Sequence, residues 1–181
     1  MTLEPDLRDD LLAAVPSLRA FAISLSGHVD RADDLVQDTL LRALSNLHRF
    51  ERGTNLNAWL FTILRNLFHS QYRKRRREVE DPDGSYASRL TVQPEQGARL
   101  DFEDFRTALS TLPHDQREAL LLIGASGFSY EEAAVICGCA VGTIKSRVNR
   151  ARSRLSSILK VDATEAIGSD PVIRAALHTA R

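Results

Sequence analysis

The sequence contains only two cysteines and carries no net charge at neutral pH. Cys137 and Cys139 flank Gly138, and a C-x-C pair in a tight turn has poor disulfide geometry. A zinc site would need a second pair of ligands at a suitable spacing, which is missing. We therefore expect both cysteines to be small, buried turn residues. The balanced charge excludes a generally basic protein that coats DNA.

Long apolar runs are missing as well. No stretch approaches the length of a membrane span, and the N-terminal MTLEPDLRDD lacks the basic and apolar regions of a signal peptide. The sequence also lacks a glycine-rich phosphate loop, and its five histidines are scattered rather than clustered at metal-ligand spacing. We expect a cytoplasmic protein that is not an enzyme and needs no cofactor or metal.

The segment from Ser129 to Arg154 predicts a helix-turn-helix. Ser129 and Glu132 form an S-x-x-E capping box that starts a first helix. Gly138 can adopt the left-handed conformation that ends this helix, before a second helix starts near Ala140. An apolar stripe of the second helix is expected to pack inward. It consists of Ile144, Val148, Ala151 and Leu155.

The opposite side of the second helix is polar and basic. It carries Lys145, Ser146, Arg147, Asn149, Arg150, Arg152, Ser153 and Arg154. Arginine and lysine can donate to guanine, asparagine pairs well with adenine, and flanking cations neutralise phosphates. A solvated basic helix is the alternative, but exposed helices usually mix charges, and no acidic residue occurs from Ala133 through Val161. The pattern therefore favours nucleic-acid binding.

Residues 6–78 are predicted to be helical throughout. Leu11–Leu25 is an apolar, amphipathic helix in which Pro16 should mark a break or a new start. Asp30 is predicted to cap a second helix, which ends near Phe50.

A third, long helix is expected from Leu56 into Arg77, with Asn55 as its cap. It combines aromatic and basic residues, namely Trp59, Phe61, Phe68, Tyr72, Arg73, Lys74, Arg75, Arg76 and Arg77. Aromatic rings stack unpaired bases and cations hold the phosphates of a strand, which makes single-stranded DNA a credible ligand. The alternative for Trp59 is burial in the core, and Asn66 and Ser70 are then better placed to meet a base.

One polar face resists a DNA explanation. Asp34, Gln37, Asp38 and Arg42 lie away from the apolar stripe of their helix. Carboxylates repel phosphates, so this face should contact protein or only water.

Residues 79–99 lack a helical period and contain two prolines and two glycines, which predicts a flexible interdomain linker. A second helical unit is expected over 100–160, with helices at Asp101–Leu112 and Pro113–Gly124 before the helix-turn-helix. A C-terminal tail, 161–181, has no predicted role. The expected fold is all-α, with two small helical domains.

Two blocks of the sequence resemble regions 2 and 4 of the extracytoplasmic-function (ECF) sigma factors, group 4 of the sigma-70 family. The first block holds DLVQDTLLRAL at 34–44 and NAWLFTILRN at 57–66. The second holds LPHDQREALLL at 112–122, GFSYEEAA at 127–134 and GCAVGTIKSRVNRAR at 138–152. The resemblance covers about Leu11 to Leu159. Within the family, the second block is similar to the alphaproteobacterial general-stress group, called EcfG-type.

The resemblance implies a function that composition alone does not. A sigma factor binds core RNA polymerase and directs promoter-specific initiation, here of general stress response genes. Residues 6–78 would be region 2, for core binding and for recognition and melting of the −10 element, and residues 100–160 would be region 4, for the −35 element. A GGAAC-like −35 element and a GTT-containing −10 element are expected. The implied partners are the β′ clamp helices and β flap of the polymerase, promoter DNA, and a NepR-type anti-sigma factor controlled by a PhyR-type response regulator, with no membrane.

The resemblance also implies roles for individual residues. Positions matching those that grip the β′ clamp helices are Asp34, Gln37, Asp38 and Arg42. Positions assigned to the −10 element, where a flipped base is captured, are Arg52, Asn55, Asn57, Trp59, Asn66, Ser70 and Arg73. Positions assigned to the −35 element are Lys145, Ser146, Arg147, Asn149 and Arg150. Asn149 stands where some relatives carry an aromatic residue, which leaves its base preference open.

Two alternatives remain at this point. A sigma-mimicking response regulator would titrate an anti-sigma factor, but it would carry a receiver domain, for which the chain has neither room nor a βα pattern. A stand-alone helix-turn-helix regulator would bind duplex DNA without polymerase, but it leaves the polar face from Asp34 to Arg42 unexplained.

Overall fold

The computed structural model describes residues 5–78 and 98–159, and the side chains of 7–75 and 104–159. Within these ranges every regular element is a helix, which confirms the all-α prediction. The chain divides into two compact units, Met1–Ser88 and Arg89–Arg181. Most of the predicted linker and the predicted tail lie outside the described residues.

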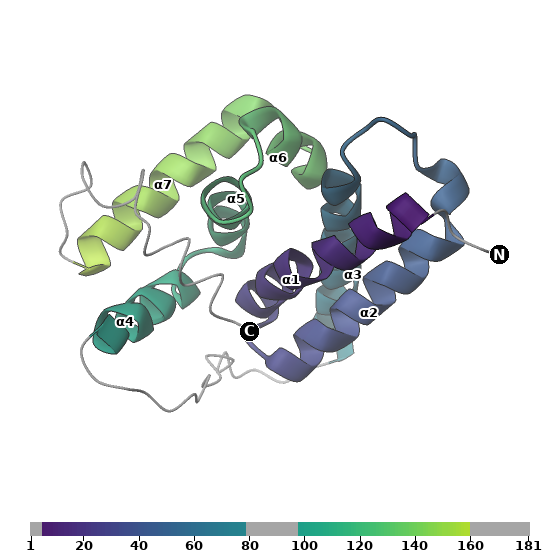
Figure 1. Ribbon diagram of the computed structural model, residues 1–181. Helices are drawn as coiled ribbons and strands as arrows, with labels where there is room; N and C mark the ends of the chain where they lie inside the picture. The colour runs from purple at the N-terminus through teal and green to yellow at the C-terminus, as the bar shows by residue number, and fades with distance from the viewer. Residues whose placement is uncertain (1–4, 79–97, 160–181) are drawn as a thin grey trace. The chain divides into compact units, whose positions relative to one another are not determined.

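Over its described residues the first unit is built on three α-helices: α1 (Pro5–Ser26), α2 (Val29–Ser45) and α3 (Leu56–Glu78). Figure 1 shows α1 and α2 side by side with α3 crossing them, and each helix contacts the other two. Their shared core is aliphatic and aromatic, and the rings of Phe21 and Phe61 lie 5.0 Å apart between centroids. Fully buried members include Leu18, Leu35, Leu60, Phe61 and Leu64.

The predicted break at Pro16 is wrong, because α1 continues through it. Proline removes one backbone donor, so the carbonyl of Leu12, one turn earlier, loses its helical partner. Pro16 and Leu12 both lie on the exposed side of α1, where water can satisfy that carbonyl. The helix therefore tolerates the proline without breaking.

Both predicted ends of the second helix are also wrong. α2 starts at Val29 with His28 as its N-cap, while Asp30 falls inside the first turn, where a carboxylate favours the positive end of the helix dipole. The helix ends at Ser45 rather than near Phe50, and a 3-10 turn, η1 (Leu47–Arg49), follows.

The α2 end has a local cause. The side-chain amide of Asn46 donates to the carbonyl oxygen of Arg42 at 2.8 Å, and such side-chain bonds compete with continuation of a helix. By contrast, the predicted cap of α3 is confirmed, since Oδ1 of Asn55 accepts a hydrogen bond from the amide of Ala58 at 3.1 Å.

The described residues of the second unit form four helices: α4 (Ala98–Ser110), α5 (His114–Gly124), α6 (Tyr130–Cys137) and α7 (Val141–Leu159). α7 packs against the other three, as its position in Figure 1 illustrates for α5 and α6. α4 begins before the predicted Asp101, so the last residues assigned to the linker are helical.

Arg117 ties α4 to α5. Its Nη2 donates to the carbonyl oxygen of Leu112 at 3.1 Å and also to that of Ser110, which satisfies backbone acceptors at the end of α4 and just after it. Burial lowers the pKa of Arg117 below its ordinary value.

The predicted helix-turn-helix is confirmed in detail. The amide of Ser129 donates to the Glu132 carboxylate at 2.8 Å, and the amide of Glu132 donates to the Ser129 hydroxyl at 3.1 Å, which completes the capping box. Gly138 is left-handed, with φ of 61° and ψ of 42°. All four predicted residues of the α7 stripe are buried. Cys137 is buried as predicted, but Cys139 is only half-buried.

Candidate nucleic-acid and polymerase interfaces

The acidic face of α2 consists of Asp34, Gln37, Asp38 and Arg42, and all four are exposed. Their three- and four-residue spacing places them on one side of the helix. Nε2 of Gln71, on α3, donates to Oδ2 of Asp38 at 3.4 Å, so α3 supports one end of this face.

Leu41 is the residue of this region that the sequence reasoning missed. It lies one turn beyond Gln37 and Asp38, and 57% of it is exposed. A single exposed leucine is ordinary on a solvated surface, but inside a polar face it also has the chemistry of an apolar anchor with a polar rim. One indication of this exposure is present in the sequence, because Leu41 lies off the apolar stripe of its helix, next to Leu40, which belongs to the stripe.

The exposed loop before α3 carries two of the predicted −10 residues, and the first turn of α3 carries a third, Asn57. Arg52, Asn55 and Asn57 are all exposed, and Gly53 has a positive φ of 89°. The side-chain carbonyl oxygen of Asn55 caps α3. Asn55 therefore shapes the end of the loop and also lines it.

Trp59 is half-buried, which lies between the open stacking surface and the core burial considered for it. Its ring lies 5.2 Å from that of Phe50 between centroids, with 40° between the planes. This contact joins the two ends of the loop between η1 and α3. The geometry therefore makes Trp59 a support of the loop more than an open stacking surface.

Farther along α3, Asn66, Ser70 and Arg73 are exposed at spacings of four and three residues, which places them on one face. The ring of Tyr72, also largely exposed, stacks on Phe68 with 6.2 Å between centroids. The basic end of α3 continues with exposed Lys74 and Arg75.

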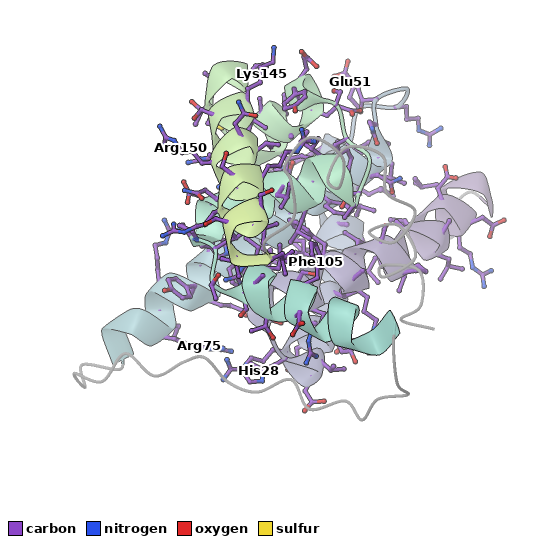
Figure 2. All side chains as sticks on the ribbon, turned by 90° about the vertical axis from the view of Figure 1, so that its left-hand side faces the viewer. His28, Glu51, Arg75, Phe105, Lys145 and Arg150 are labelled. Carbon is purple, nitrogen blue, oxygen red and sulfur yellow. The ribbon has the colours of Figure 1, made fainter. Side chains whose placement is uncertain are left out.

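The predicted −35 residues separate into two groups on α7. Lys145, Asn149 and Arg150 are exposed, and Figure 2 shows Lys145 and Arg150 projecting from the helix. Ser146 is half-buried, and its hydroxyl donates back to the Thr143 carbonyl oxygen at 3.3 Å.

Arg147 belongs with Ser146 rather than with the exposed group. Its side chain is only 23% exposed, and Nε lies 3.1 Å from Oδ2 of Asp115 on α5. The structure thus places a narrow, exposed set of donors on one side of α7, and holds Arg147 against α5.

No helix among residues 5–78 and 98–159 is long and apolar enough to cross a membrane.

Two protein-family models match the chain: Sigma-70 region 2 over residues 12–78, and Sigma-70, region 4 over residues 102–155. The chain is also 72% identical over 177 residues to the ECF RNA polymerase sigma factor EcfG of Rhodopseudomonas palustris (strain TIE-1), covering 98% of both proteins. The chain belongs to the ECF sigma factors of the EcfG type. It is a non-enzymatic initiation factor that directs transcription of general stress genes by RNA polymerase.

A solved structure agrees with this assignment. The sigma factor RpoE of Bartonella quintana, solved in complex with the anti-sigma factor NepR, is 60% identical, with a TM-score of 0.79 over 88% of this chain and 99% of that one. The PhyRSL–NepR complex of Sphingomonas sp. Fr1 matches at 21% identity with a TM-score of 0.64, over 91% of this chain and 96% of that one, and shares the fold alone. The ECF sigma factor, rather than the mimic or the stand-alone regulator, is therefore the correct interpretation.

Proposed function

We propose that the two units of this EcfG-type sigma factor divide promoter recognition between them. Residues 6–78 bind core polymerase and open the −10 element, residues 100–160 bind the −35 element, and residues 79–99 connect them, leaving 161–181 as a tail. The observation that carries this proposal is the segregation of charge on exposed surfaces. Carboxylates gather on α2, whereas exposed cations gather at the end of α3 and on α7.

The acidic face of α2 is the proposed contact for the β′ clamp helices, through Asp34, Gln37, Asp38 and Arg42. DNA is an unsuitable partner for two exposed carboxylates, because its phosphates repel them. Leu41 supplies the apolar anchor that such an interface needs. The second unit would contact the β flap.

The −10 element is the proposed ligand of the loop before α3 and of the exposed α3 face. Arg52, Asn55 and Asn57 would enclose a flipped base, with Asn66, Ser70 and Arg73 along the strand. Trp59 would act mainly through Phe50, by holding the loop in shape. Opening the duplex costs a free energy of roughly a few kcal/mol, and capture of the unstacked bases offsets this cost.

The −35 element is the proposed ligand of α7. Lys145, Asn149 and Arg150 project into solvent and would donate to base edges in the major groove. Ser146 and Arg147, which are engaged with the protein itself, would contribute by fixing the helix and by reaching phosphates at its edge.

An anti-sigma factor of the NepR type is the proposed regulator, released through a PhyR-type response regulator, in the cytoplasm. The support is the 60% identity to the Bartonella quintana sigma factor that was solved with NepR. When NepR is added in increasing amounts to this chain and core polymerase, binding of the chain to core polymerase should fall in proportion to the NepR added. Unchanged core binding would contradict this regulation.

Run-off transcription tests the main proposal. Purified core RNA polymerase is assayed with and without the full chain, on a promoter with GGAAC and GTT elements and on a copy with both elements scrambled. We expect transcripts only with the protein and only from the intact promoter. Equal transcription from both templates would refute selection by these two elements.

A further inference from the structure

Tyr130, the first residue of α6, lies beneath a side chain of the recognition helix. The ammonium nitrogen of Lys145, on α7, is 5.8 Å from the centroid of the Tyr130 ring and lies over its face. A cation in this position is attracted by the negative face of the ring. The contact joins the two helices of the helix-turn-helix at the side where Lys145 is exposed.

The backbone that carries the ring is fixed by local hydrogen bonds. The capping box of Ser129 and Glu132 fixes the first turn of α6, which includes Tyr130. Left-handed Gly138 and the start of α7 at Val141 then set the distance between this turn and Lys145. The ring thus extends from a fixed backbone, whereas the ammonium of Lys145 lies at the end of a flexible four-carbon chain.

Lysine has a flexible four-carbon chain that must be ordered when its ammonium contacts DNA. A ring that restrains the chain in the free protein reduces the entropy lost on binding, which is the general benefit of preorganisation. Other cations of α7 differ in this respect. Arg147 is held by Asp115, and no ring contact is seen for Arg150 within the described residues.

We propose that Tyr130 is a positioning residue for Lys145, holding its ammonium where it meets the −35 element. This inference rests on the proposed role of α7. The face of the Tyr130 ring, and not its phenolic hydroxyl, restrains the lysine. Tyr130 thus contributes to promoter affinity without itself reading a base.

The test compares four variants of the full chain assembled with core RNA polymerase: Tyr130→Phe, Tyr130→Leu, Lys145→Ala, and the double variant Tyr130→Leu with Lys145→Ala. Fluorescence anisotropy measures the dissociation constant for a labelled promoter with the intact −35 element and for a copy with that element scrambled. Tyr130→Met provides a second ring-free variant in case Tyr130→Leu unfolds. Circular dichroism confirms that each variant retains its helices.

We expect Tyr130→Phe to bind like the parent, because the ring remains. Tyr130→Leu should weaken binding to the intact element by about two- to ten-fold, the range that corresponds to ordering one long side chain on binding. It should leave binding to the scrambled element unchanged. In the Lys145→Ala background, Tyr130→Leu should have no further effect, since its only partner in this role is gone.

Four outcomes would overturn the proposal. An equal loss in Tyr130→Phe and Tyr130→Leu would assign the effect to the hydroxyl. A loss in Tyr130→Leu that persists in the Lys145→Ala background would show that the ring acts independently of the lysine. No loss in Tyr130→Leu, although Lys145→Ala weakens binding, would refute positioning while leaving the −35 role of Lys145 intact. If Lys145→Ala itself has no effect, the proposed base contact fails, and the positioning role fails with it.

Discussion

Arg147 Nε on the recognition helix lies 3.1 Å from Asp115 Oδ2 in the first turn of α5. Nη1 of the same guanidinium is 3.8 Å from Sγ of Cys139, in the turn between α6 and α7. One arginine thus contacts both α5 and the turn that sets the angle of the recognition helix. Its orientation is fixed by the protein before DNA arrives.

Asp115→Asn should loosen the docking of α7 on α5. The substitution keeps an acceptor of the same shape but removes the charge, and a partly exposed ion pair contributes at most about 1 kcal/mol. Amide hydrogen exchange in α7, around Val148, should therefore accelerate by up to about five-fold. Helices of the first unit should exchange at unchanged rates.

Arg147→Ala supplies the control for this pair. If the ion pair is the cause, Asp115→Asn should have little additional effect in the Arg147→Ala background. Fully additive effects of the two substitutions would show that they act through separate contacts.

Arg150→Ala should weaken promoter binding through one base pair of the −35 element. Arg150 is exposed on α7, and a good bidentate contact to a base discriminates by roughly 1–3 kcal/mol. We expect the loss on the intact element to disappear when that base pair is already substituted. Holoenzyme binding to a set of single-base −35 variants measures this.

Two matched variants sharpen the Arg150 experiment. Ser157→Ala, exposed on α7 but outside the polar and basic set, should change little. Arg75→Ala, at the basic end of α3, should weaken binding to all sequences. It should also reduce the slope of log affinity against log salt concentration by about one, the value for one lost phosphate contact. Equal losses for Arg150→Ala on matched and mismatched −35 elements would rule out base recognition by that residue.

Local signals in the sequence predicted much of this fold. The capping box at Ser129, the left-handed Gly138 and the Asn55 cap each depend on a few neighbouring residues, and all three appear as predicted. The inward-facing stripe of α7 could also be predicted from the sequence, since helical periodicity alone defines it. The residue types on the opposite face of α7 indicated the kind of ligand that this helix binds. They did not indicate which of these side chains remain exposed.

What the sequence could not supply depends on tertiary contacts. The partner of Arg147 lies on another helix, so a run of similar cations gave no reason to separate it from Arg150. Pro16 was misjudged because its cost depends on whether the orphaned carbonyl meets solvent, which is a property of the packed bundle. For Leu41, the position off the apolar stripe was readable from the sequence, but the degree of exposure depends on how the first unit packs.

Leu41→Ala should weaken core polymerase binding without harming the fold. An exposed apolar anchor within a polar rim is the kind of residue whose truncation costs about 1–2 kcal/mol at an interface, which is roughly a ten-fold change in affinity. Competition for core polymerase against a labelled copy of the parent chain measures the effect.

Leu12→Ala is the matched control for Leu41→Ala. Both leucines are 57% exposed, but Leu12 lies on α1, away from the sequence segment proposed to meet the β′ clamp helices. Its truncation should leave core binding unchanged. Equal effects of the two substitutions would argue against a specific contact at the acidic face of α2.

Gly138→Ala and Gly142→Ala provide the same chemical change in two backbone states. Neither glycine has an atom within 4 Å of where a Cβ would lie, so crowding plays no part in either. Gly138 has a φ of 61°, where a side chain costs roughly 1–2 kcal/mol. Gly142 lies within α7, where alanine is favoured over glycine.

We therefore expect opposite signs from the two alanines. Gly138→Ala should accelerate amide exchange in α6 and α7 and reduce −35-dependent transcription, because the turn sets how the recognition helix is presented. Gly142→Ala should slow exchange slightly or leave it unchanged. Gly138→Asn should recover part of the loss, since asparagine tolerates the left-handed conformation better than alanine does. If all three variants exchanged alike, the turn would not depend on that backbone conformation.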